Sequence, residues 1–155
     1  MIANIHASCV ALGAEGVLLL GPSGAGKSDL ALRLIDGGAR LVADDRCEIF
    51  VRAGKLHARA PDSIAGLMEM RGIGIIALPH AKSVAVAMAV RLGPSRARLP
   101  ELMFYVPPTG LKPARRVPLI MVKPATASAP ARIRAALAAF SQGRFRDTFN
   151  RKSRT

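Results

Sequence analysis

The chain has little of several residue types that define common protein classes. Its 155 residues include two cysteines and no tryptophan, and aromatic residues make up 4% of the chain. Cys9 and Cys47 are too few for a disulfide framework, and neither lies in a CxxC or Cys/His motif typical of zinc sites. We therefore expect two reduced, partly buried thiols and no structural zinc.

Long apolar runs are also missing, although half of the residues are apolar and the chain should fold. The runs at 17–20 and 84–90 are far shorter than the roughly 18 residues of a membrane span. The first residues show no basic region followed by an apolar region, the pattern of a signal peptide. We therefore expect a cytoplasmic protein that does not contact a membrane.

Acidic residues are scarce, with 10 Asp and Glu against 23 Lys and Arg, and the net charge is +13. Residues 112–155 hold eleven of the basic residues and one acid, Asp147, whereas residues 1–111 carry a net charge of only +3. Such a basic segment suits acidic protein surfaces, phosphate-bearing substrates or nucleic acid. Because aromatic residues for base stacking are few, we expect a solvated or subunit-contacting face rather than nucleic-acid binding.

One motif that is present carries a specific chemistry. The pattern G-x-x-x-x-G-K-[ST] is matched in full by Gly21, Pro22, Ser23, Gly24, Ala25, Gly26, Lys27 and Ser28. Its glycines allow successive backbone N–H groups to point at phosphate oxygens, and the helix that follows adds the positive end of its dipole. Lys27 is then expected on the β- and γ-phosphates and the Ser28 hydroxyl on Mg²⁺. The motif predicts a nucleotide-phosphate cradle.

Chemistry on a second substrate needs a proton acceptor and acids that hold metal. The pair Asp44–Asp45 follows a short apolar strand at 41–43 and is the best candidate. The carboxyl ends of parallel strands surround the ligand crevice of an α/β sheet, so these acids are expected beside the cradle. His6 is a further candidate, although a single histidine near a chain end is more often a surface residue.

Apolar periodicity predicts an α/β domain with a mixed, mostly parallel central sheet at 1–143, followed by a basic tail at 144–155 that need not be rigid. We expect helices at 29–36 and 64–68 and a third that begins near Ser128, with Pro130 in its first turn. The predicted strands are 17–20, 41–43, 73–78, 84–92, 102–106 and 117–122, with a hairpin formed by 48–51 and 55–58.

Four segments together resemble the catalytic domain of HPr kinase/phosphorylase. They are the sequence IHA at 5–7, the phosphate cradle, LVADD at 41–45 and MEMRGIGII at 68–76. The similarity covers residues 1–80 well, and it is to the short form of the family, which lacks a separate N-terminal domain. It implies a P-loop fold like that of phosphoenolpyruvate carboxykinase and assembly into a hexamer.

The resemblance also implies a reaction and roles for particular residues. A protein-serine kinase of this family transfers the γ-phosphoryl group of ATP, or a phosphoryl group of pyrophosphate, to an HPr-type carrier. Asp44 would be the base, assisted by His6. Asp45, Ser28 and Glu69 would serve Mg²⁺, and Arg71 would lie close to the acids and phosphates.

One segment departs from the family pattern. Longer members have a basic, glycine-containing loop after the strand that matches 117–122, and this loop is associated with dephosphorylation. Here residues 123–128 contain no glycine and only one charge, on Lys123. The sequence therefore favours the kinase reaction and leaves the phosphorylase reaction open. Two further readings remain: a P-loop kinase of a small metabolite, and a non-catalytic nucleotide sensor.

Overall fold

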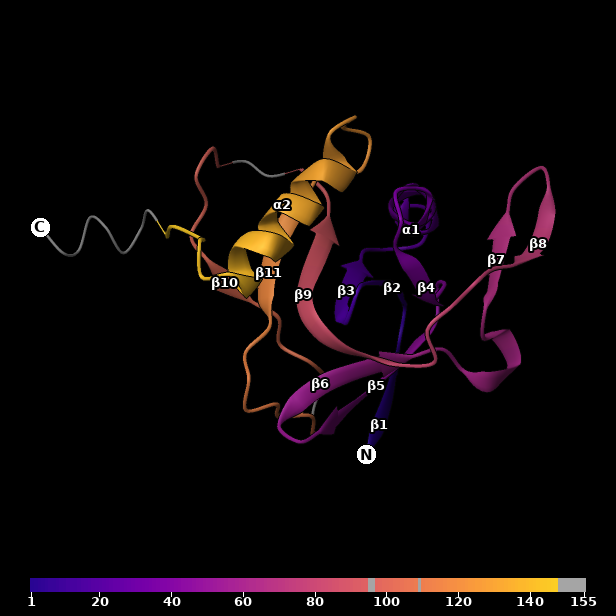
Figure 1. The fold of residues 1–155 in the computed structure, drawn as a ribbon, viewed down its shortest axis with the longest axis horizontal. Helices are drawn as coiled ribbons and strands as arrows, with labels where there is room; N and C mark the ends of the chain where they lie inside the picture. The colour runs from indigo at the N-terminus through magenta and orange to yellow at the C-terminus, as the bar shows by residue number, and fades with distance from the viewer. Residues whose placement is uncertain (95–96, 109, 148–155) are drawn as a thin grey trace, which may run out of the picture.

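In the described part of the chain, nine strands form one curled sheet, and both α-helices lie on the same side of it (Figure 1). This computed structural model describes residues 1–94, 97–108 and 110–147, so the predicted tail lies outside the described residues from position 148 onward. The strands of the sheet are β1 (Ile2–Ile5), β2 (Ala7–Leu12), β3 (Glu15–Leu20), β4 (Arg40–Ala43), β5 (Cys47–Arg52), β6 (Lys55–Arg59), β9 (Val84–Leu92), β10 (Met103–Phe104) and β11 (Pro118–Val122).

The sheet is mixed, as expected, but the prediction of a mostly parallel sheet is wrong. Its order is β1-β5-β6-β9-β3-β2-β4, with β11 beside β9 and β10 beside β11. Among the described strands, β9 pairs in parallel with β3 and β11, and the other six pairs are antiparallel. The prediction omitted β1 and β2, and a tight turn at Gly13 (φ 62°) folds β2 back onto β3. Such a short connection permits only an antiparallel pair.

Two apolar clusters pack against the two faces of this sheet. On one face, α1 (Lys27–Asp36) and α2 (Ala129–Ser141) bury Leu30, Leu34 and Ile133 completely. Each such side chain contributes roughly 1.5–3 kcal/mol relative to an exposed position. On the other face, the curl of the sheet encloses a second cluster that includes residues of β2, β5, β6 and β11. Strand β9 supplies residues to both clusters, so it is covered on both faces.

The expected helix at 64–68 is wrong. A single 3-10 turn, η1 (Asp62–Ile64), ends there, and β7 (Leu67–Met70) follows. Gly66 lies between them in the left-handed region (φ 76°) and accepts a hydrogen bond from the N–H of Leu78, which closes the base of a hairpin. The hairpin consists of β7 and β8 (Gly74–Ala77), forms a separate two-stranded sheet and projects away from the main body (Figure 1).

Other predicted elements are present with changed bounds. The expected hairpin is β5–β6, and the strand expected at 102–106 shortens to the two residues of β10. Ser128 precedes α2 as predicted, but its hydroxyl accepts a hydrogen bond from Arg132 Nε instead of capping a backbone N–H. No helix in the described part of the chain is both long and apolar enough to cross a bilayer.

Candidate active site

The predicted phosphate cradle connects β3 to α1. Strand β3 lies in the centre of the sheet between β9 and β2, so the loop that follows it starts from the most buried part of the fold. Gly26 immediately precedes α1 and adopts a left-handed conformation (φ 100°), as does Gly24 (φ 81°). Other L-residues rarely adopt these angles, which explains the glycines of the motif. The loop therefore ends at the N-terminus of a helix, where anions bind.

Lys27 is almost completely buried, with 5% of its surface exposed. Its Nζ donates hydrogen bonds to the carbonyl oxygens of Gly21, at 2.6 Å, and Pro22, at 3.0 Å. A buried ammonium group requires partners of this kind, and phosphate oxygens are stronger acceptors than amide carbonyls. The loop thus holds the lysine charge where an incoming phosphate would meet it.

The acidic pair follows β4 and connects directly to the cradle. The carboxylate Oδ1 of Asp44 accepts hydrogen bonds from the Ser28 hydroxyl, at 2.7 Å, and from the Ser8 hydroxyl, at 3.2 Å. The Ser8 oxygen also accepts the backbone N–H of Asp45, at 3.1 Å, and Ser8 is completely buried on β2. Asp45 has a left-handed backbone (φ 66°), a conformation that is uncommon outside glycine and often marks functional sites. Ser8 therefore fixes the geometry of both acids.

Most of the predicted site residues line one cavity of about 530 Å³. Its predicted members are Ser23, Gly24, Gly26, Lys27, Ser28, Asp44, Asp45, Glu69 and Arg71. Gly21, Pro22 and Ala25 belong to the loop but do not line this cavity. His6 is exposed in the turn between β1 and β2 and does not line it either. The next residue, Ala7, donates its N–H to the Asp45 carbonyl, so His6 is a neighbour of the acidic pair in the fold.

The donor atoms in the cavity suit Mg²⁺. Asp45, Ser28 and Glu69 offer only oxygen ligands, which magnesium prefers. No group of three or more His, Cys, Asp or Glu that could hold a metal occurs among residues 1–94, 97–108 and 110–147. Magnesium in kinases is commonly held by one or two carboxylates together with substrate phosphates and water. The residues present therefore fit an ion that arrives with a nucleotide.

Two thiols lie near the acids but are chemically quiet. Cys9 and Cys47 are free and buried, as the sequence suggested. Burial raises the pKa of Cys9 well above its ordinary value and the pKa of Cys47 to about 12. A thiol that is not ionised at neutral pH is a poor nucleophile and a poor metal ligand. Their role is to fill the apolar cluster inside the curled sheet.

Comparison with known proteins assigns the family. The family model described as HPr Serine kinase C-terminal domain matches residues 2–89, which is more than half of the chain. The chain belongs to this HPr kinase family. The resemblance inferred from the sequence is thereby confirmed, and of the three functional readings the family favours the first.

Curated members of the HPr kinase family match over a shorter stretch. HPr kinase/phosphorylase of Limosilactobacillus reuteri is 47% identical over 74 residues, and that of Caldanaerobacter subterraneus is 51% identical over 74 residues. In both cases the match covers 47% of this chain, and 23% and 24% of the respective relative. The aligned part is thus about a quarter of the length of these enzymes.

A solved structure matches nearly the whole fold. The Hpr(Ser) kinase/phosphatase from Coxiella burnetii superposes with a TM-score of 0.75 and covers 91% of this chain and 97% of that one. The sequence identity is 24%, so the match establishes the shared α/β architecture.

Sequence reasoning missed several residues of the site. Ser8, which contacts Asp44, is the most important residue that was missed. The sequence feature that could have revealed it is a single hydroxyl residue within the otherwise apolar run at 7–12. The other unpredicted residues that line the cavity are Asp29 and four apolar residues: Leu32, Met68, Met70 and Ile73. Three of them lie in the β7–β8 hairpin region, inside the segment that resembles this HPr kinase family, but periodicity alone gave them no role.

Proposed function

We propose that the chain is a protein-serine kinase that transfers the γ-phosphoryl group of Mg-ATP to a serine of an HPr-type carrier protein. The observation that carries the proposal is the Ser28–Asp44 hydrogen bond of 2.7 Å, which joins the phosphate cradle to a candidate base inside one cavity. Family membership and the names of the relatives, which are HPr kinase/phosphorylases, support the choice of substrate.

In this proposal, different residues of the cavity bind the phosphates, hold Mg²⁺ and stabilise negative charge. The P-loop amides and Lys27 bind the phosphates, and Lys27 exchanges its two carbonyl partners for β- and γ-phosphate oxygens. Ser28, Asp45 and Glu69 would hold Mg²⁺, which neutralises charge on the transferring phosphoryl group. Arg71 lies in the same cavity and would stabilise the negative charge of the phosphates.

Asp44 is proposed as the base. Both hydroxyl groups that contact it, on Ser8 and Ser28, bond to Oδ1, and within the described part of the chain Oδ2 accepts no hydrogen bond. Oδ2 would take the proton of the substrate serine as its oxygen forms a bond to the γ-phosphorus. The bond from that phosphorus to the β–γ bridging oxygen breaks, and ADP leaves. His6 would assist from the adjoining turn.

The first test is the intact mass of an HPr-type carrier after incubation with the chain and Mg-ATP. We expect a mass increase of one phosphate that survives mild acid, as a serine ester does. Asp44→Asn is expected to lower the rate by about 10²–10⁴-fold with ATP binding retained, since a general base contributes about that much. ATP binding without carrier phosphorylation by the wild type would contradict the proposal.

A second test separates the two acids. Asp45→Asn is expected to raise the Mg²⁺ concentration required for half-maximal rate, while Asp44→Asn lowers the rate at every Mg²⁺ concentration. The opposite pattern would exchange the roles of the two residues. Adding inorganic phosphate to the phosphorylated carrier tests the phosphorylase reaction, and light scattering tests the oligomer that the resemblance implies.

A further inference from the structure

A second cavity adjoins the P-loop, and the proposed reaction leaves it unused. This cavity has a volume of about 400 Å³, within the range of small-molecule sites, and six residues line it: Ala25, Gly26, Asp29, Arg33, Pro124 and Ala125. Gly26 and Asp29 also line the catalytic cavity. The two cavities therefore meet across the last glycine of the loop and the first turn of α1.

The polarity of a P-loop decides which part of a nucleotide each cavity suits. The lysine of the motif reaches the β- and γ-phosphates, and its serine serves the metal, so the γ-phosphate points toward Asp44 and Asp45. The α-phosphate and the nucleoside must leave the loop on the side away from these acids. The second cavity is lined by neither Asp44 nor Asp45 and is bounded instead by Gly26, Arg33 and the turn at Pro124.

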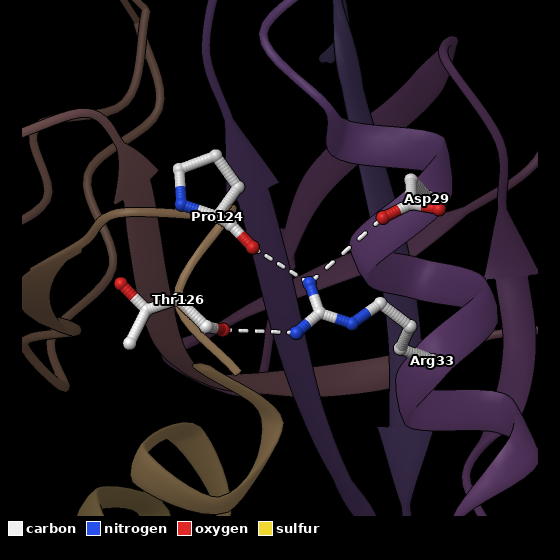
Figure 2. Close-up of polar contacts among 4 residues, drawn as sticks. All are labelled: Asp29, Arg33, Pro124 and Thr126. Carbon is white, nitrogen blue, oxygen red and sulfur yellow. Dashed lines mark hydrogen bonds and ion pairs between the residues drawn. The ribbon is translucent and has the colours of Figure 1, made fainter. Parts of the chain in front are cut away.

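One wall of this second cavity is held in place by Arg33 of α1. Figure 2 shows its guanidinium group between the helix and the turn that follows β11, where Nη1 donates to the Pro124 carbonyl at 2.6 Å and Nη2 to the Thr126 carbonyl at 2.9 Å. The Pro124 ring is thereby brought against the P-loop, since a Cβ at Gly26 would lie 3.5 Å from Pro124 Cβ. The wall is thus formed before any ligand binds.

The chemistry of the second cavity fits a ribose and a base. Ala25, Pro124 and Ala125 present an apolar surface. The hydrogen bonds of a guanidinium group lie in its plane, so those of Arg33 do not use its flat faces, and the 29% of its side chain that is exposed can stack on a purine. The Asp29 carboxylate lies 3.8 Å from Arg33 Nη1, at the edge of the same cavity. Because the Asp29 side chain is 74% exposed, its carboxylate can accept hydrogen bonds from ribose hydroxyls.

We infer that this second cavity is the nucleoside subsite, with Arg33 positioning the turn at 123–126 and Asp29 accepting the ribose hydroxyls. The inference rests on the proposed function, because it requires a nucleoside triphosphate in the P-loop. It also gives the segment that departs from the family pattern, residues 123–128, a role in nucleotide recognition.

The test compares Mg-ATP with Mg-tripolyphosphate, which has the phosphates and no nucleoside. Ala125→Trp fills the second cavity, and Ala127→Trp is the matched control, because Ala127 is exposed on the same turn and does not line the cavity. In titration calorimetry, Ala125→Trp is expected to raise the dissociation constant for Mg-ATP about tenfold and to leave that for Mg-tripolyphosphate unchanged. Ala127→Trp is expected to leave both affinities unchanged.

An unchanged ATP affinity in Ala125→Trp would overturn the inference, and so would an equal loss for both ligands. If the wild type binds tripolyphosphate as tightly as ATP, the nucleoside subsite is wrong while the phosphate site of the proposed function stands. If the wild type binds neither ligand, the proposed function itself fails.

A second variant tests the ribose contact. Asp29→Asn keeps the shape of the side chain and weakens it as an acceptor. The wild type is expected to prefer ATP over 2′,3′-dideoxy-ATP by about tenfold, and Asp29→Asn should lose most of that preference. The same preference in both proteins would exclude Asp29 from the ribose contact.

Discussion

The two walls of the proposed catalytic cavity are built in different ways. The wall that carries the proposed phosphate cradle follows β3, whose residues Leu18 and Leu19 are completely buried, and continues into α1. The facing wall is the β7–β8 hairpin, which shares no ladder with the main sheet and leaves Ile73 and Ile75 at least 70% exposed. An isolated two-stranded hairpin is marginally stable, so this wall depends on a few anchors.

Met68 is the main anchor of the hairpin. It is 1% exposed and belongs to the apolar cluster that includes Leu30 and Leu34 of α1. We expect the loop at 21–28 to keep its shape with the core, whereas the hairpin can change its position at a lower cost in free energy. A cavity with one rigid and one weakly held wall suits the proposed reaction, in which the serine of another protein would enter the site.

The largest expected effect comes from removing the anchor. Met68→Ala should lower the free energy of unfolding by about 2–5 kcal/mol, the range for truncating a buried large side chain. Amide exchange should rise more in β7 and β8 than in β3. Ile75→Ala, on the exposed side of the same hairpin, is the control and should stay within about 0.5 kcal/mol of wild type. If denaturant titration finds the same loss in the free energy of unfolding for Met68→Ala and Ile75→Ala, Met68 does not hold the hairpin.

The second expected effect is a loss of ATP affinity when Lys27, in the wall formed by the loop at 21–28, is replaced. Lys27→Met removes the buried ammonium and keeps the length of the side chain. We expect the affinity for Mg-ATP to fall by about 10- to 100-fold, since hydrogen bonds to charged groups contribute about 1.5–3 kcal/mol. Lys55→Met, an exposed substitution on β6, should bind ATP as the wild type does. Calorimetry that finds no loss for Lys27→Met would show that the backbone cradle alone holds the phosphates.

The smallest effect concerns the support of the acids. Ser8→Ala leaves the Asp45 N–H without its acceptor and removes one donor from Asp44, so the free energy of unfolding should fall by about 1–2 kcal/mol. The rate of carrier phosphorylation should fall while ATP affinity is retained. Ser63→Ala, exposed in η1, should change neither quantity. If the two variants behave alike, Ser8 does not position the acids.

Local patterns predicted the parts of the fold that depend on neighbouring residues. The strand–loop–helix unit around Lys27, the β5–β6 hairpin and the long strand β9 are where periodicity and glycine positions placed them. They were predictable because their backbone hydrogen bonds or apolar faces are set within a short stretch of chain. The helix expected at 64–68 failed because Gly66 takes a left-handed conformation and the chain pairs with β8 instead.

The pairing of strands that lie far apart in the sequence could not be predicted from local patterns. Strand β2 lies between β3 and β4 and pairs antiparallel with both, although the β3–α1–β4 order suggested parallel neighbours. Strand partners are chosen by side-chain packing over the whole sheet, which a single sequence does not display. The same pairing brings Ser8 to Asp44, 36 residues further along the chain.

The sequence by itself determined the strand–loop–helix unit that carries the proposed phosphate cradle, since the glycines of the loop, Lys27 and Ser28 act through the backbone and neighbouring residues of one short segment. It also determined that Asp44 and Asp45 follow a strand. Only the tertiary structure decided that Ser8 orients both acids, that the hairpin residues form the opposite wall, and that Arg33 holds residues 124–126 against the P-loop. These contacts join segments far apart in the chain, and their formation depends on how the whole sheet curls and packs.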